Sequence, residues 1–336
     1  RFIDTLSFEK WEAGSPWRAY YQFCKHFLAP LALMGYLDPT LNDLMRSNLD
    51  GIPLAIATRL LPWRARFRPG LAIHLYAHAR ANERLEHRAR VSPCRDEAAI
   101  QPQVSLRALQ GIVESLCTTV RRLPSPPLRG RWVKYYTTDP YSESDQRAKQ
   151  GFIEEVLSQT RPQRVCDLGS NTGVYSRLVA KLGAYVIAVD SDWESVEENY
   201  RICSSEMPDT VLPMRVDVAN PSPGLGWAGE ERVPFLERAK ADAVLVLALV
   251  HHLVIGNNIS FQDIAEMLAK IVRRDLVIEF IEPQDPQVQR LIRQRQTISE
   301  DYSRSRFERA FSGFFKNLRE FPLPGGTRSL LWMRAL

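Results

Sequence analysis

From residue 146 onward, short apolar segments alternate with amphipathic ones, and this alternation limits the fold more than any other feature of the chain. Five segments have the composition of strands that are apolar on both faces: 164–169, 185–190, 211–218, 241–250 and 275–281. The stretches between them carry apolar residues at helical spacing: 172–183, 192–207, 230–240 and 261–272. The pattern therefore predicts an α/β fold with a parallel sheet covered by helices on both sides.

The C-terminal segments predict an antiparallel addition to this sheet. A long helical segment is expected over 285–315. The apolar segments 316–323 and 329–336 then flank the turn sequence PGGT, which is typical of a hairpin.

The first part of the chain has a different pattern. Residues 8–120 place apolar side chains at helical spacing, which predicts a helical N-terminal region over 1–120. Residues 121–145 mix proline, glycine and serine with aromatic residues and show no period, so they are interpreted as an aromatic linker. Its aromatic residues are Trp132, Tyr135, Tyr136 and Tyr141. The third predicted domain is 146–336.

The net charge of +5 is distributed unevenly. Residues 1–150 carry 22 Lys+Arg against 14 Asp+Glu, and the remainder carries 22 against 25. Most of the basic residues are arginines spread through helical sequence, which is more typical of a solvated surface than of a nucleic-acid groove. Nucleic acid is therefore not the expected partner.

Five cysteines, at positions 24, 94, 117, 166 and 203, match neither a disulfide framework nor a zinc spacing. They predict reduced thiols in a cytoplasmic protein. The apolar runs are far shorter than the roughly 20 residues that a membrane span needs, so we expect no membrane span and no membrane partner.

The first predicted strand runs into the sequence DLGSNTG. A glycine-containing turn between strand and helix lets the backbone approach a ligand and directs free N–H groups at it. A dinucleotide fingerprint would need glycine-like residues at 169, 171 and 174, where the chain has Gly, Asn and Val, and the Gly-Lys-Ser/Thr ending of a P-loop is missing. Both familiar phosphate-binding turns are therefore excluded.

The turn resembles the D-x-G-x-x-x-G turn of class I S-adenosylmethionine-dependent methyltransferases, and the resemblance covers roughly 146–336. It implies a Rossmann-like, seven-stranded sheet, mostly parallel with a C-terminal antiparallel hairpin, and S-adenosyl-L-methionine as the cofactor. In that family the first acidic residue and the glycine turn hold the methionine end of the cofactor, which implicates Asp167, Gly169 and Gly173. Asn171 replaces a glycine of many members, and asparagine tolerates left-handed backbone angles.

The resemblance also assigns the other end of the cofactor. Asp190 corresponds to the carboxylate that accepts hydrogen bonds from both ribose hydroxyls, with Asp192 as its substitute, and Asp217 to the residue that receives the adenine amino group. The remaining predicted cofactor contacts are Ser170, Ser191, Val218 and Leu247. Each aspartate alone could be a helix N-cap or a turn residue. Three carboxylates at successive strand ends, however, meet at the edge where such folds bind ligands.

The histidine pair in ALVHHL falls at the end of the fourth predicted strand. Neighbours along a strand point to opposite sides, so His251 and His252 are not expected to share a metal ion, and no metal site is predicted. One histidine is expected to face the acceptor as a general base and the other to pack against the sheet or the next helix. For either one alone, a buried structural role is an equal alternative. Glu279, with Glu282, is expected near the end of the next strand, against either the acceptor or solvent.

A narrower resemblance covers nearly the whole chain. The segments WRAYYQFCKHFLAPL, DGIPLAIATRLLP, WVKYY, ANPSPGLGW and LALVHHL are similar to the bacterial methyltransferases named after a nodulation protein. This resemblance implies cytoplasmic methylation connected to carbohydrate or lipo-oligosaccharide tailoring, with the N-terminal region as a lid or acceptor platform. The leading hypothesis is transfer of a methyl group to a hydroxyl of a small-molecule or glycan-like acceptor. Two alternatives stay open: an RNA methyltransferase, and a non-catalytic protein that binds the cofactor and a partner. The oligomeric state is not predicted.

Overall fold

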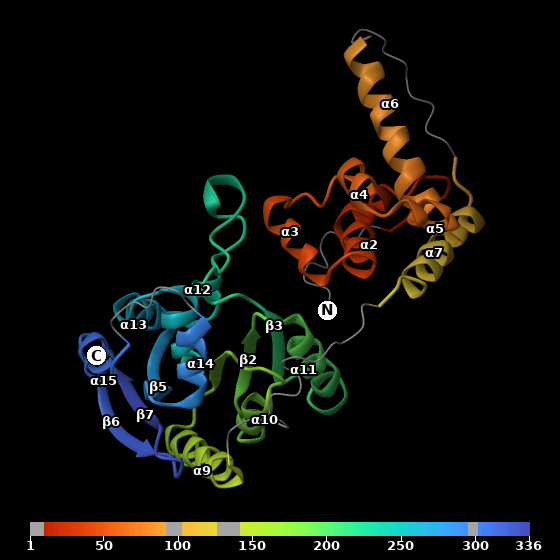
Figure 1. Ribbon diagram of the computed structural model, residues 1–336. Coiled ribbons are helices and arrows are strands. Elements are labelled where there is room, and N and C mark those ends of the chain that lie inside the picture. The colour runs from red at the N-terminus through yellow and green to blue at the C-terminus, as the bar shows by residue number, and fades with distance from the viewer. Residues whose placement is uncertain (1–9, 92–102, 126–141, 295–301) are drawn as a thin grey trace. The chain divides into compact units, whose positions relative to one another are not determined.

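The computed structural model describes residues 10–91, 103–125, 142–294 and 302–336 (Figure 1). It contains two compact units, Arg1–Pro127 and Leu128–Leu336. The four aromatic residues of the predicted linker lie outside the described residues. None of the helices in the described ranges has the length and apolar character that crossing a bilayer requires.

The first unit is helical, as the apolar spacing predicts. Its elements are α1 (Tyr20–Phe23), η1 (Cys24–Leu28), α2 (Ala29–Tyr36), η2 (Pro39–Asp43), α3 (Leu44–Ser47), α4 (Leu54–Leu60), η3 (Trp63–Phe67), α5 (Pro69–Leu71), η4 (Ala72–Ala77), α6 (His78–Val91) and α7 (Leu106–Arg121). Prolines 39, 53, 62 and 69 stand at or just before the first residues of four of these short elements, where a missing N–H costs no hydrogen bond. One apolar core, which includes Leu28, Leu33 and Leu75, holds the elements together.

The second unit contains a seven-stranded sheet in the order β3-β2-β1-β4-β5-β7-β6. The strands are β1 (Arg164–Leu168), β2 (Tyr185–Asp190), β3 (Val211–Arg215), β4 (Ala241–Val246), β5 (Val272–Ile281), β6 (Phe315–Pro322) and β7 (Arg328–Ala335). Strands β1 to β5 pair in parallel, while β7 runs antiparallel to both β5 and β6. This topology confirms the predicted methyltransferase sheet with its C-terminal hairpin.

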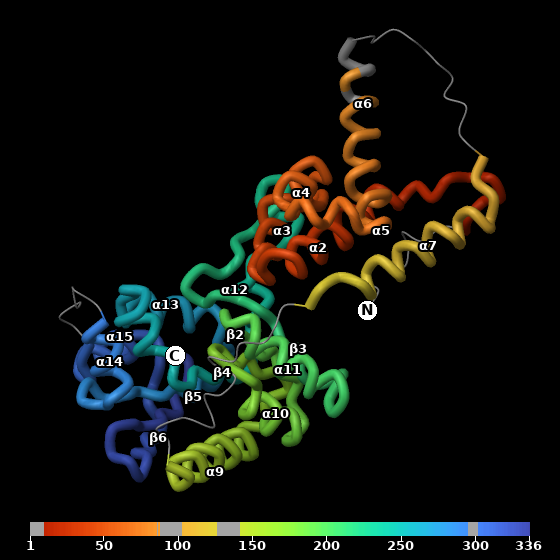
Figure 2. The backbone as a smooth tube through the Cα atoms, turned by 45° about the vertical axis from the view of Figure 1, so that its right-hand side comes forward, coloured from red at the N-terminus to blue at the C-terminus, as the bar shows by residue number. Residues whose placement is uncertain are grey.

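Helices cover both faces of the sheet (Figures 1 and 2). They are α9 (Glu143–Thr160), α10 (Val174–Lys181), α11 (Trp193–Glu206), α12 (Phe235–Arg238), α13 (Phe261–Ile271), α14 (Pro286–Gln294) and α15 (Arg304–Ser312), with the short turns η5 (Trp227–Gly229) and η6 (His252–Gly256). Alternate strand residues enter different cores: Val244 and Val246 pack with α12 to α15, whereas Ala243 and Leu245 pack with α9 to α11. Both faces are apolar because both are buried.

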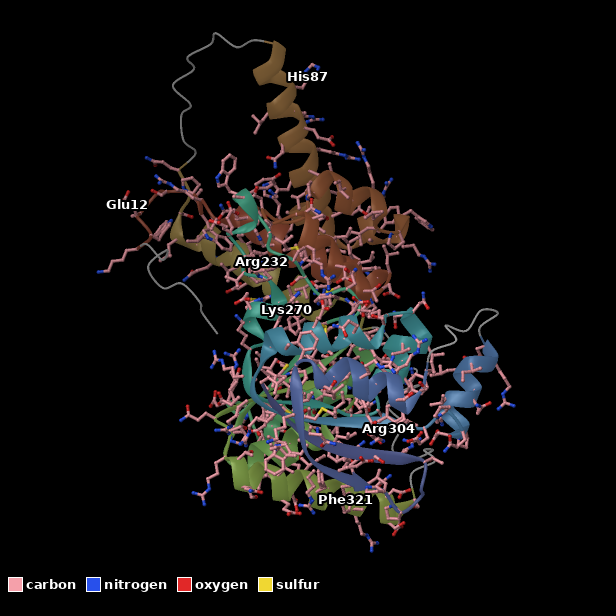
Figure 3. The ribbon with its side chains drawn as sticks, turned by 90° about the vertical axis from the view of Figure 1, so that its left-hand side faces the viewer. Glu12, His87, Arg232, Lys270, Arg304 and Phe321 are labelled. Atoms are coloured by element: carbon pink, nitrogen blue, oxygen red, sulfur yellow. The ribbon has the colours of Figure 1, made fainter. Side chains whose placement is uncertain are left out.

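The hairpin is fixed to the rest of the unit at two places. Phe321 of β6 stacks on Phe152 of α9, with ring centroids 5.2 Å apart. Figure 3 labels Phe321 and Arg304, which belong to these two places. Arg304, at the start of α15, pairs with Glu320 of β6 and lies over the ring of Phe280. These contacts attach the hairpin to α9 and to the start of α15.

The fourth strand is shorter than predicted. It ends at Val246 and not at residue 250, because Ala248 adopts a left-handed backbone with a φ of 50°. The chain turns helical from Val250, so His251 and His252 lie on a helical turn. The predicted placement of the two histidines on a strand was therefore wrong.

Two helix predictions were also too long. Within 230–240 only Phe235–Arg238 is helical, because Leu225 pairs with Arg232 as a β-bridge and Pro234 precedes the first turn. The segment 285–315 forms two helices, α14 and α15, and residues 295–301 between them lie outside the described ranges.

Candidate functional site

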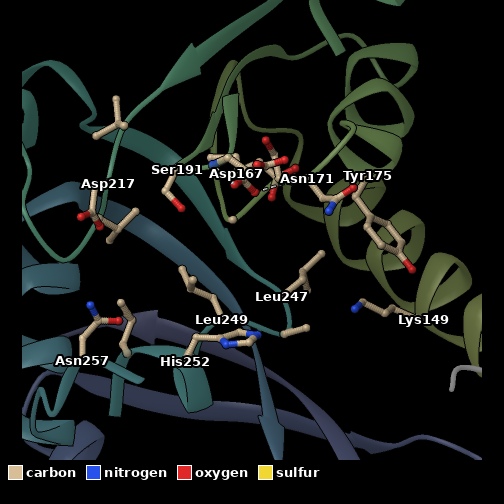
Figure 4. A pocket seen from close by; sticks show the side chains of 18 residues that line it. Lys149, Asp167, Asn171, Tyr175, Ser191, Asp217, Leu247, Leu249, His252 and Asn257 are labelled. Atoms are coloured by element: carbon tan, nitrogen blue, oxygen red, sulfur yellow. Dashed lines mark hydrogen bonds between the residues drawn. The ribbon is translucent and has the colours of Figure 1, made fainter. Parts of the chain in front are cut away.

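The carboxyl ends of the parallel strands surround a pocket of about 300 Å³ in the second unit (Figure 4). Its lining residues are Lys149, Asp167, Gly169, Ser170, Asn171, Tyr175, Asp190, Ser191, Asp192, Val216, Asp217, Val218, Leu247, Ala248, Leu249, His252, Leu253 and Asn257. Nine of the ten predicted cofactor contacts are among them; Gly173 is the exception. Figure 4 shows Asp217 and Lys149 at opposite sides of the pocket.

The glycine turn after β1 bends its backbone toward the pocket. Gly169, Asn171 and Gly173 all have positive φ, at 75°, 49° and 75°. The N–H groups of Gly169 and Ser170 donate to the carbonyl of Val189 on β2. These bonds join the turn to the neighbouring strand. Position 171 can hold asparagine in place of glycine, because asparagine is among the few residues that tolerate a left-handed backbone.

Gly173 has a structural role. It precedes the first residue of α10, and a Cβ placed on it would lie 2.1 Å from Oδ1 of Asn199. Asn199 is buried and accepts a hydrogen bond from Arg177. Glycine is needed here both for the backbone conformation and for the space that Asn199 occupies.

We expect Gly173→Ala to lower the free energy of unfolding by about 2–4 kcal/mol, because it adds a clash to an unfavourable φ. Gly183→Ala is the matched control: its φ is also positive, at 97°, but its Cβ would meet nothing within 4 Å. That variant should lose only about 1 kcal/mol. Urea unfolding of both variants measures the difference, and equal losses would remove Asn199 from the explanation.

Asp190, at the end of β2, is held by backbone donors. The N–H groups of Asn171 and Asp192 donate to its two carboxylate oxygens, at 2.8 Å and 2.9 Å. Burial raises the pKa of Asp190, and these hydrogen bonds oppose the rise. The second carboxylate, Asp192, caps α11 by accepting from the backbone N–H and the hydroxyl of Ser195. Asp190 thus has a fixed orientation at the pocket, and its free lone pairs can accept from a ligand.

Asp167, at the end of β1, is almost fully buried beneath the glycine turn. The hydroxyl of Ser176 donates to its Oδ2 at 2.6 Å. Burial raises the pKa of Asp167 to about 6, while the Ser176 hydrogen bond and the charge of Lys149 act in the opposite direction. A buried carboxylate is costly to keep charged without a cation nearby. A cationic ligand group beside Asp167 would reduce that cost.

Asp217 lies beyond the end of β3 on the exposed side of the pocket. One of its carboxylate oxygens accepts from the N–H of Ala219, which makes it a turn residue as well as a lining residue. Val218, its neighbour in the chain, adds apolar surface to the same pocket. This end can therefore hold a flat, mostly apolar group with a polar edge.

Lys149 lines the pocket and was missed by the sequence reasoning. Its ammonium group donates to Glu279 Oε2 at 2.6 Å and lies 5.0 Å from the centre of the Tyr175 ring. A signal existed in the sequence: Lys149 falls within the buried stripe of α9, whose other members include Phe152, Ile153 and Val156. A lysine in a core stripe indicates a buried partner.

Glu279 was predicted to face either the acceptor or solvent, but it neither lines the pocket nor reaches the surface. It lies within β5, fully buried, on the sheet face that α9 covers. Besides Lys149, its Oε2 accepts from the N–H of Ala248 at 2.9 Å. The carboxylate therefore holds the left-handed turn that ends β4. Glu282 pairs with Arg304.

The two histidine rings lie 4.2 Å apart, but their environments differ. His252 lines the pocket, whereas His251 is buried and its Nδ1 has no hydrogen-bond partner. Burial lowers the pKa of His252, and it lowers that of His251 further, aided by the nearby charges of His252, Arg328 and Lys149. His252 is therefore the histidine that can meet a ligand, and it is neutral at pH 7.

The described residues contain no cluster of three metal-ligating side chains. Cys24, Cys117, Cys166 and Cys203 are free thiols, and burial raises the pKa of Cys166 to about 12. The polar groups that face the pocket are thus the carboxylates, Lys149, Tyr175, His252 and small polar side chains.

Comparisons with known proteins give one relative along most of the chain. No family model matches. Nodulation protein NoeA of Rhizobium meliloti (strain 1021) is 30% identical over 330 residues, which are 98% of this chain and 68% of that protein.

Among solved structures, N-methyltransferase NodS from Bradyrhizobium japonicum WM9, in complex with S-adenosyl-L-homocysteine, has a TM-score of 0.45 at 10% identity, over 62% of this chain and 94% of that chain. Magnesium protoporphyrin IX methyltransferase (ChlM) from Synechocystis PCC 6803, with bound SAH, has a TM-score of 0.42 at 15% identity, over 61% and 93%.

Proposed function

This chain belongs to the family of nodulation protein NoeA, and from its pocket we propose that it is an S-adenosylmethionine-dependent methyltransferase. One observation carries the proposal. Asp167, Asp190 and Asp217 stand at or just beyond three neighbouring strand ends and line one pocket with the glycine turn. A nucleoside joined to an amino acid carries hydrogen-bond donors at three separated points, which are the amino group of the amino acid, the ribose hydroxyls and the amino group of the base.

The cofactor is S-adenosyl-L-methionine, oriented by the charges of the pocket. Asp167 and the glycine turn would hold its amino group, and the ammonium group of Lys149 would attract its carboxylate. Asp190 accepts from the ribose hydroxyls, with Asp192 beside it. Asp217 and Val218 receive the adenine. The remaining contacts come from Ser170, Asn171, Ser191 and Leu247. Gly173 does not touch the cofactor but positions the glycine turn at the start of α10.

The methyl acceptor is a hydroxyl of a small or glycan-like molecule that enters at His252. When bound, the cofactor supplies a methyl group already activated on a sulfonium, so the protein has mainly to position the acceptor. Neutral His252 accepts the hydroxyl proton as the oxygen bonds to the methyl carbon, and the electrons of the broken carbon–sulfur bond remain on sulfur. Leu247 and Leu249 exclude water from this end.

Calorimetric titration with S-adenosylmethionine, S-adenosylhomocysteine and NAD tests the cofactor. We expect micromolar binding of the first two and none of NAD. Asp190→Ala should weaken binding by about ten- to a hundred-fold, because it removes charge-assisted hydrogen bonds to the ribose. Glu206→Gln, which removes a charge from the exposed end of α11, should change nothing. Equal affinity of wild-type protein and Asp190→Ala would remove the ribose assignment.

The acceptor is tested separately by transfer of a labelled methyl group into glycans, small phenols and RNA. Product at a hydroxyl supports the proposal. Product only on RNA would favour the RNA methyltransferase, whose binding should weaken steeply with salt. Cofactor binding without turnover on any acceptor would leave a non-catalytic partner protein as the better description.

A further inference from the structure

The first unit carries exposed apolar side chains next to arginines, which we name the basic-apolar patch. It consists of Ile56, Arg59, Leu60, Trp63, Arg64, Phe67 and Arg68. Trp63 is 66% exposed and Phe67 is 70% exposed, while Ile56 and Leu60 are each 45% exposed. Such exposure of large apolar residues in a short segment marks an interaction surface.

The exposed apolar members of the patch lie close together along the chain, between residues 56 and 67. Ile56 and Leu60 are one helical turn apart on α4. Trp63 and Phe67 belong to the next element, η3, and their rings meet edge to face, with centroids 5.7 Å apart. Two apolar pairs therefore follow one another in this segment.

The charged residues of this part of the chain have a single sign. Residues 51–82 contain five arginines, at positions 59, 64, 66, 68 and 80, and neither aspartate nor glutamate. Arg59, Arg64 and Arg68 are all exposed. A surface that combines exposed aromatic and aliphatic residues with uncompensated positive charge complements a partner that is both apolar and anionic.

We propose that the basic-apolar patch binds the surface of a lipid bilayer that contains anionic lipids. Tryptophan and phenylalanine insert at the level of the lipid headgroups, and arginines bind the phosphates around them. Nucleic acid fits less well, because Ile56 and Leu60 would gain nothing from phosphates or stacked bases, whereas they lose contact with water in a bilayer.

This proposal differs from the expectation of no membrane partner, which rested on the absence of an apolar run long enough to span. Contact with the surface of a bilayer needs no span. It does not depend on the proposed methyl transfer, because the patch and the pocket belong to different units.

Flotation of the full chain with vesicles tests the proposal. We expect binding to vesicles of phosphatidylcholine mixed with phosphatidylglycerol, weak binding to phosphatidylcholine alone, and a loss of binding as salt is raised. Arg64→Gln/Arg68→Gln should weaken binding to the anionic vesicles by about 25-fold, at about five-fold per arginine. Trp63→Ala/Phe67→Ala should weaken it at high and low salt alike.

Matched controls come from the second unit. Trp227→Ala removes a tryptophan that is 83% exposed, and Arg309→Gln/Lys316→Gln removes two exposed positive charges. Neither should change vesicle binding. The proposal is overturned if the full chain does not float with anionic vesicles, or if the control variants lose as much binding as the patch variants. Retention of single-stranded RNA without vesicle binding would assign the patch to nucleic acid.

Discussion

Glu279→Ala is expected to destabilise the second unit by about 3–5 kcal/mol, because it leaves the buried ammonium group of Lys149 without its partner. The side chains of Lys149 and Glu279 are 3% and 0% exposed, so water compensates for the lost interaction far less than it would at the surface. The N–H of Ala248 loses its acceptor in the same variant. Urea unfolding followed by circular dichroism measures the change.

Lys149→Met should cost less, since Arg328 Nη1 lies 4.0 Å from Glu279 Oε1 and still compensates part of its charge. The double variant Lys149→Met/Glu279→Gln should lose less stability than the sum of Lys149→Met and Glu279→Gln, because it leaves no unpaired charge. Glu155 lies on the same helix as Lys149 and forms an exposed ion pair with Arg319. Glu155→Ala breaks this pair and should cost less than about 1 kcal/mol. Similar losses of stability in Glu279→Ala and Glu155→Ala would show that burial does not strengthen the dependence of Lys149 on Glu279.

The ion pair also affects the pocket. Glu279 connects α9, β5 and the turn after β4 through Lys149 and Ala248. Leu247 and Leu249, which flank Ala248, line the pocket. Substitution of Glu279 should therefore weaken cofactor binding although this residue does not reach the pocket.

The sequence predicts the framework of this site well, because that framework is local. Strands buried on both faces appear as continuous apolar runs, and the DLGSNTG turn joins two adjacent elements. The positions of Asp167, Asp190 and Asp217 follow directly from the ends of β1, β2 and β3. Parallel pairing then places them at one edge without further information.

The wrong end of β4 and the missed Lys149–Glu279 pair have a different cause, because both depend on contacts between distant residues. The end of β4 is set by Ala248, whose N–H binds a carboxylate 31 residues later. Lys149 and Glu279 are 130 residues apart, and neither position reveals the other. Without that pair, the run 241–250 has the pattern of one continuous strand, and the histidines fall on the wrong element.

The same helical turn separates the roles of the two histidines. As a hypothesis that rests on the proposed function, His252→Leu should lower methyl transfer by about 10²- to 10⁴-fold and leave cofactor affinity nearly unchanged. His251→Leu is the matched control. His251 Nδ1 has no hydrogen-bond partner, so an apolar side chain of similar volume removes no bond from that atom.

The pH dependence tests the same assignment. Burial lowers the pKa of His252 below the usual 6.5, so its neutral form is present at pH 7 and is lost only in more acidic solution. Turnover should therefore rise with pH through that lowered pKa and stay level above pH 7. In His252→Leu the residual rate should lose this rise, while His251→Leu should keep it. If His251→Leu instead abolishes turnover with cofactor binding intact, the base is His251, and the pocket must open toward it during the reaction.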